Sequence, residues 1–136
     1  FHYFNYDKDS TQHVFEGGVI LNVPKTDISL GVYTNFYGND KKKDNGDIVY
    51  STYAEIKYKY EIKKLSTIMD FACGFALNGQ DEGFYNNDGF SCVNLALGFT
   101  KQIAINNNLS LPIYTRLIAN PNDNKLYLVC GTTITL

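Results

Sequence analysis

The sequence contains no tryptophan, and it shows no excess of positive charge. Its 12 Lys and Arg residues stand against 14 Asp and Glu residues, giving a formal net charge of -2. This composition provides no basic surface of the kind that nucleic acids require. No apolar run approaches the ~18–20 residues of a membrane-spanning helix, and no segment follows a helical period. Strands cross membranes without such runs, so their absence excludes helical spans alone.

Histidine and cysteine are too scarce and too scattered to indicate a metal site. The two histidines and three cysteines have no zinc-like spacing, so we expect no metal and no cofactor. The alternation of side chains along the strands places Cys73 and Cys92 on opposite faces, which argues against a disulfide between them. We interpret these two residues and Cys130 as small buried hydrophobic residues.

The clearest pattern in the chain is a period of two that runs from Ile48 to Lys63. One set of alternate positions is apolar or aromatic, and the other is charged around Glu55, Lys57 and Lys59. Because successive side chains of a strand point to opposite faces, this pattern predicts a long strand with one oily and one charged face. Eleven Tyr and nine Phe residues agree with a β protein.

The same alternation recurs along the chain, which we expect to fold as one domain over residues 1–136. The predicted strands are Phe1–Tyr6 (the end of a strand), Gln12–Val23, Ile28–Tyr37, Ile48–Lys63, Leu65–Leu77, Phe90–Ile105, Leu109–Ala119 and Lys125–Leu136. Tight turns alternate with longer polar loops, as in an antiparallel up-and-down meander. We therefore predict an all-β, up-and-down barrel of about eight strands, or part of a larger barrel. The start at Phe1 without Met indicates a processed protein or a fragment.

The charged faces also carry many Gly, Ala and Ser residues, such as Gly74, Ala76 and Gly98. Side chains on a solvated outer face have no reason to be small, whereas side chains inside a narrow barrel must fit a limited space. We predict a polar network inside the barrel, held together by cross-strand ion pairs. Its expected members are Glu16, Glu55, Lys57, Lys59, Glu61, Asp70 and Arg116.

The opposite faces stay apolar over strands of ten or more residues, and spanning β-strands need about 9–11. We expect these faces to meet lipid, with aromatic residues among them. The expected lipid-facing aromatic residues are Tyr58, Tyr60, Phe71, Phe75 and Phe99.

The stretch LPIYTRLIANPNDNKLYLVCGTTITL resembles the C-terminal hairpin of outer-membrane β-barrel proteins, especially uncharacterised barrels of Bacteroidetes-type bacteria. Its end is similar to the signal that such barrels present to their assembly machinery, through Gly131, Ile134 and Leu136. The family prefers aromatic residues where Ile134 and Leu136 are aliphatic. The resemblance implies the outer membrane of a Gram-negative bacterium, with tight turns in the periplasm and loops outside. It also implies contact with outer-membrane lipid and a protein partner in a membrane complex.

Catalysis has weak support in the sequence. His13 lies near Ser10 and Thr11, but nothing fixes a Ser/His/acid geometry there, so we expect no enzyme. The Asp- and Asn-rich loops lack the EF-hand register and are interpreted as solvated. The main hypothesis is a non-enzymatic barrel whose loops bind an external ligand or a partner. The alternatives are a small pore and a soluble lipocalin-like barrel with an apolar ligand.

Overall fold

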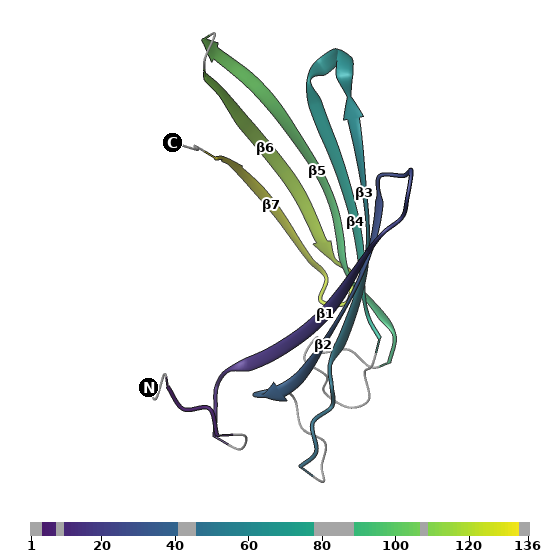
Figure 1. The fold of residues 1–136 in the computed structure, drawn as a ribbon, viewed down its shortest axis with the longest axis vertical. Helices are drawn as coiled ribbons and strands as arrows, with labels where there is room; N and C mark the ends of the chain where they lie inside the picture. Colours follow the sequence, from purple (N-terminus) through teal and green to yellow (C-terminus); the bar gives the residue numbers. More distant parts are fainter. Residues whose placement is uncertain (1–3, 8–9, 41–45, 78–88, 107–108, 134–136) are drawn as a thin grey trace.

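A computed structural model describes residues 4–7, 10–40, 46–77, 89–106 and 109–133 of the protein. These residues form a single sheet of seven strands in which each strand pairs antiparallel with the next one along the chain (Figure 1). The strands are β1 (Val14–Asn22), β2 (Ile28–Gly38), β3 (Thr52–Ile62), β4 (Thr67–Ala76), β5 (Ser91–Asn106), β6 (Leu109–Asn120) and β7 (Lys125–Thr132). The all-β, antiparallel, up-and-down class predicted from the sequence is confirmed.

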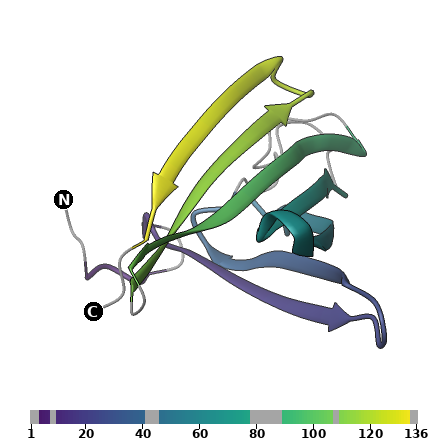
Figure 2. The same cartoon turned by 90° about the horizontal axis from the view of Figure 1, so that it is seen from above.

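The sheet is open rather than closed. In the view from above it forms an arc whose two edge strands, β1 and β7, lie apart (Figure 2). The expected first strand is not formed by the described residues 4–6, which adopt turn and irregular backbone, and residues 1–3 lie outside the described ranges. The described sheet therefore has seven strands where the sequence predicted about eight.

The connections alternate between the two ends of the sheet. The strand ends that the β1–β2, β3–β4 and β5–β6 connections join are at the upper end of Figure 1, and those that the other three connections join lie toward its lower end. The β3–β4 turn is a single 3-10 turn over Lys63–Leu65, and Ser66 closes it in the left-handed conformation with φ 48°. The connections alternate between the two ends as the sequence predicts, but the β6–β7 connection over residues 121–124 is shorter than the β1–β2 connection over residues 23–27. We refer to the two ends as the turn end and the loop end.

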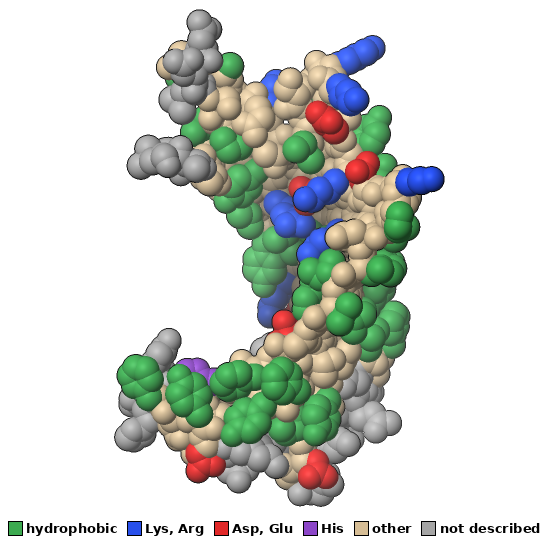
Figure 3. All heavy atoms as spheres, in the orientation of Figure 1, with side chains coloured by type: hydrophobic (Ala, Val, Ile, Leu, Met, Phe, Trp, Pro, Cys, Tyr) green, Lys and Arg blue, Asp and Glu red, His purple; other side chains and the backbone are tan. Residues whose placement is uncertain are grey.

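The register gives the sheet two chemically different faces. On one face, the row that crosses β3, β4, β5 and β6 consists of Lys59, Asp70, Gly98 and Arg116. On the other, the row displaced by one residue is formed by Tyr58, Phe71, Leu97 and Leu117, and it continues into β7 at Leu128. Charged side chains gather in the hollow of the molecule in Figure 3, so the polar face is the concave one.

The long strand predicted from Ile48 begins later than its alternation suggests. Regular pairing starts at Thr52, because Tyr50 has a φ of 58° and the Ser51 N–H is taken by a side chain. That side chain is Asp40, whose Oδ2 accepts the bond at 2.9 Å. The Ser51 N–H thus donates to an acidic side chain of the preceding loop instead of to the sheet ladder.

The sheet has three register shifts, of which the last lies between Ala104 and Asn106, beside the β5–β6 connection. The first lies between Phe15 and Glu16. The second lies between Gly74 and Phe75, where β5 advances one extra residue and brings Cys92 opposite Phe75. Such a bulge reverses the alternation on one side of it.

The predictions about cysteine were wrong in two respects. Cys92 on β5 stands opposite Phe75 on β4. Phe75 is two residues after Cys73, so Cys92 and Cys73 both lie on the convex face. The three thiols are also not fully buried: Cys73 and Cys92 are half-buried, and Cys130 is exposed with its Sγ 3.2 Å from Thr115 Oγ1. The bulge cannot be seen in the sequence, because Val93 continues an ordinary strand pattern.

Candidate functional site

Glu55 is the centre of the concave polar face. It lies in the middle of the sheet and is only 9% exposed. The hydroxyls of Tyr33 and Tyr53 donate hydrogen bonds to its two carboxylate oxygens, at 3.4 and 3.3 Å, and Lys57 forms an ion pair with it. A buried carboxylate needs such partners because its desolvation is otherwise unfavourable.

The space above a glycine lets this network cross strands. A Cβ on Gly74 would lie 2.1 Å from the Tyr53 hydroxyl. Only glycine at this position of β4 therefore leaves room for the Tyr53 side chain of β3. The Tyr53 hydroxyl in turn accepts a hydrogen bond from Asn94 Nδ2 at 3.2 Å. Asn94 on β5 is thereby connected to Glu55 on β3 across the intervening strand.

A second bridge of the same kind lies two rows closer to the turn end on the concave face. Arg116 on β6 forms a 3.0 Å ion pair with Asp70 on β4, over Gly98 on β5. A Cβ at Gly98 would lie 2.1 Å from an Asp70 carboxylate oxygen. The Arg116 Nε is buried and has no hydrogen-bond partner among the described residues. The guanidinium therefore has donor capacity beyond the ion pair.

Four of the seven residues predicted for the polar network form ion pairs in the described part of the chain: Glu55, Lys57, Asp70 and Arg116. Asp70 does pair across strands, with Arg116, although Lys59 stands directly opposite it in the register. Lys57 pairs with Glu55 along its own strand and not across the sheet. Lys59 and the exposed Glu16 and Glu61 have no ion-pair partner in the described part of the chain.

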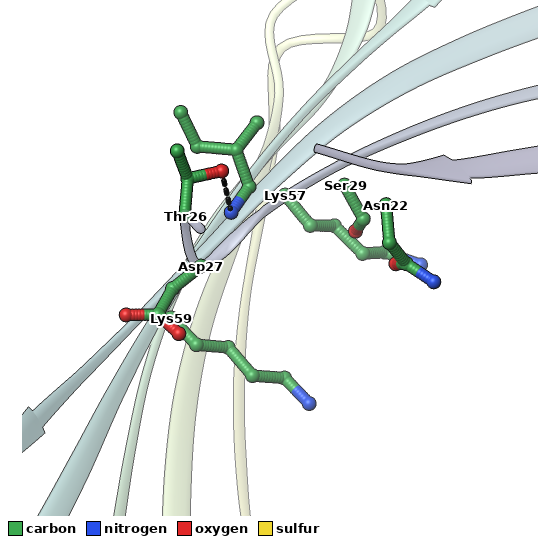
Figure 4. A pocket seen from close by; sticks show the side chains of 7 residues that line it. Asn22, Thr26, Asp27, Ser29, Lys57 and Lys59 are labelled. Carbon is green, nitrogen blue, oxygen red and sulfur yellow. Dashed lines mark hydrogen bonds between the residues drawn. The ribbon is translucent and has the colours of Figure 1, made fainter. Parts of the chain in front are cut away.

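A shallow recess of about 260 Å³ opens beside Lys57 and Lys59 at the turn end (Figure 4). Its polar lining includes Asn22, Ser29 and Lys57, which lie close together, whereas the Lys59 ammonium extends separately. Asp27 also borders the recess, but its carboxylate points away from the Lys59 ammonium. The recess can therefore hold water or a small anion weakly, and it has no enclosed apolar volume.

The predicted lipid-facing aromatic residues all lie on the convex face. Tyr58 stands opposite Phe71, and Tyr60 connects through Met69 to Phe99. Phe75 stacks on Phe90 with ring centroids 5.1 Å apart, at the loop end. A further aromatic group, which the sequence did not single out, joins Tyr6, Phe15 and Tyr37 at the same end. Ring contacts within this group measure 6.3 and 5.6 Å, and Tyr37 donates a 2.8 Å hydrogen bond to the Tyr6 carbonyl.

His13 contacts an aromatic ring and a hydroxyl group at the loop end. Its ring stacks on Tyr6 at 5.0 Å, and its backbone N–H donates to Thr11 Oγ1 at 3.1 Å. The nearby Ser10 hydroxyl accepts a hydrogen bond from the Asn5 side chain at 2.8 Å. The described contacts therefore do not place the Ser10 hydroxyl against the His13 ring.

Asp40 is a buried polar residue that sequence reasoning missed. It is 3% exposed, and its carboxylate accepts hydrogen bonds from the Asn35 side chain at 3.3 Å and from the Ser51 backbone. It lies in a run of charged residues whose pattern predicts a solvated loop, and its backbone partner, Ser51, is 11 residues away, just before β3. No local pattern marks it.

The polar loops show no metal site in the parts that the structure describes. No group of three or more His, Cys, Asp or Glu residues is arranged to hold a metal ion there. In the turn over 120–124, the Asp123 carboxylate is engaged by Lys125 at 3.0 Å and Asn122 at 3.3 Å. The hydrogen bond from Lys125 lowers the pKa of Asp123 below its ordinary value. Residues 41–45 and 78–88 of the two longest loops lie outside the described ranges.

No protein-family model, curated protein or solved structure matches this chain. Within the described ranges, no helix is both long and apolar enough to cross a membrane.

Proposed function

We propose that this chain forms part of the wall of a bacterial outer-membrane β-barrel, a non-enzymatic protein whose loops bind an external ligand or a partner. The observation that carries the proposal is the inverted distribution of polarity over the curved sheet. The convex face is apolar and exposed, with Val19 at 74% and Leu128 at 70%, whereas charges occupy the hollow. A water-soluble barrel requires the opposite arrangement, with apolar residues inside.

The strand lengths support the same proposal. β2 has 11 residues, which at about 3.3 Å per residue make about 36 Å. At a tilt of ~45°, such a strand would cover about 25 Å of depth, the height of the apolar band of these barrels. The aromatic group at the loop end and Tyr58 and Tyr60 toward the turn end lie where an interfacial girdle belongs.

Strand parity determines how a barrel that contains this sheet closes. In a meander of seven strands, β1 and β7 run in the same direction, so they cannot pair antiparallel with each other. A closed antiparallel barrel therefore contains an odd number of strands in addition to these seven. The assembly machinery would receive the end of β7 through Gly131, whereas Ile134 and Leu136 lie outside the described ranges.

The proposal is tested by solubility and heat modifiability. We expect the purified protein to require detergent, to enter lipid vesicles, and to migrate differently on gels before and after boiling. A protein that purifies monodisperse without detergent would contradict membrane insertion. It would favour a soluble barrel, although the polar hollow offers an apolar ligand little surface to bind.

A small pore is a second candidate, favoured by the Lys59 ammonium on the concave face, which has no ion-pair partner among the described residues. Its test is planar-bilayer conductance of the protein and of a variant with Lys57 and Lys59 changed to Met. A pore lined by these cations should show a changed ion selectivity in the variant. Absent conductance, or conductance identical in both proteins, would contradict the pore.

A further inference from the structure

We propose that Cys73 and Cys92 are a modification site, at which a disulfide joins β4 to β5 on the convex face near the loop end. The bond would fasten the base of the long connection between these two strands. This inference rests on the register of the sheet and not on membrane insertion, so it can succeed or fail independently of the proposed function.

The first support is the bulge in β5. Without it, Cys92 would point into the hollow, on the face opposite Cys73. With the bulge, Cys92 stands opposite Phe75. Phe75 points to the same face as Cys73, which precedes it by two residues on β4. The two cysteines thus become diagonal neighbours on adjacent strands of one face.

The second support is the direction of the Cys92 side chain. Regular diagonal neighbours have Cα atoms about 7–8 Å apart, slightly beyond the usual span of a disulfide. The Cys92 Sγ lies 4.0 Å from the carbonyl oxygen of Asn94, so it extends along β5 toward the row of Cys73, whose partner is Leu95. A rotamer change together with a small backbone shift at the bulge would bring the two sulfurs within bonding distance.

The third cysteine provides an internal control. Cys130 is on β7, two strands away from β5, and its thiol contacts Thr115. It is exposed, whereas Cys73 and Cys92 are half-buried. A reaction governed by exposure alone would modify Cys130 first, and a reaction governed by proximity would link the other two.

The reaction is a thiol–disulfide exchange with a disulfide oxidant such as oxidised glutathione. The Cys92 or Cys73 thiolate attacks the oxidant, whose S–S bond breaks and releases one reduced thiol. The second protein thiolate then attacks the mixed disulfide and releases the other reduced thiol. One protein S–S bond forms, one oxidant S–S bond is reduced, and the two protons from the cysteines end on the released thiols.

The test uses the full chain, folded and purified, in buffers of oxidised and reduced glutathione. After acid quenching, denaturation and alkylation, intact mass and peptide mapping identify the free thiols. We expect a loss of two of the three alkylated cysteines and a peptide that links Cys73 to Cys92, with Cys130 still alkylated. The Cys130→Ser variant should form the same link.

A matched variant moves one thiol to the concave face. In the double variant Cys92→Ser, Ser91→Cys, the new cysteine stands opposite Ala76, on the concave face, and should not link to Cys73. Three free thiols in the wild type under oxidising conditions would overturn the proposal. A link that involves Cys130, or equal linkage in the double variant, would overturn it as well.

Discussion

At the scale of single residues, the concave face depends on side chains that reach across a neighbouring strand. The Asp70–Arg116 bridge does so because Gly98 leaves the space between them empty. Glycine here provides space and not conformational freedom. The alternation of small and charged residues thus has a direct structural use.

We expect Arg116→Met to lower the free energy of unfolding by about 1–2 kcal/mol, because Asp70 would keep a partly desolvated charge without its partner. Lys59→Met is the matched control, since Lys59 has no ion-pair partner in the described part of the chain; its effect should stay within about 0.5 kcal/mol. Denaturant titrations of both variants measure the difference. Equal effects would mean that the ion pair contributes nothing.

The turn between β6 and β7 has a predictable response to acid. Lys125 lowers the pKa of Asp123 below its ordinary value of 3.8, so the charged form is favoured in the folded state. A depressed pKa stabilises the fold above the unfolded pKa, and this stability is lost as pH falls through the folded value. An NMR titration of the Asp123 carboxyl should show the low pKa in the wild type and a return toward the ordinary value in Lys125→Met. An unchanged titration in the variant would contradict the assignment.

At the scale of elements, the ends of strands are set by contacts that the period of two does not encode. β2 ends at Gly38, whose φ is 92° and which lies against the carbonyl of His13, the residue before β1. β3 begins at Thr52 because Asp40 holds the preceding N–H. Both ends therefore depend on residues of another segment.

Gly38→Ala should destabilise the β1–β2 edge more than Gly46→Ala. Both glycines have positive φ, so both substitutions introduce backbone strain of about 1 kcal/mol. An added Cβ would meet nothing within 4 Å at Gly46, but it would lie 2.1 Å from the His13 oxygen at Gly38. We expect about 1–2 kcal/mol of additional loss at Gly38, measured by denaturant unfolding and by faster hydrogen exchange in β1. Equal losses at the two positions would show that the close approach relaxes freely.

At the scale of the whole molecule, the convex face should respond to charge according to its depth in lipid. Leu97 lies in the middle of a row of apolar residues, and Ile105 lies near the turn end of the same strand. For the protein folded in lipid vesicles, Leu97→Arg should cost about 2–4 kcal/mol and Ile105→Arg about 0–1 kcal/mol. Equilibrium unfolding from vesicles measures both. Small and equal effects would indicate a face that meets water.

The fold class, the order of the strands and the separation of turns from loops follow from the sequence alone, because each depends on local alternation and turn residues. The residues of the polar face, including Glu55, Asp70 and Arg116, were also predictable for that reason. Their pairings were not, because Arg116 reaches Asp70 across a strand that only the register identifies. The face on which Cys92 lies was not predictable for a related reason, because one extra residue in β5 reverses the alternation of the residues beyond it. The open edges of the sheet and the burial of Asp40 likewise result from contacts between segments far apart in the chain. Alternation determined what the two faces are made of, and the tertiary structure decided which residues meet on them.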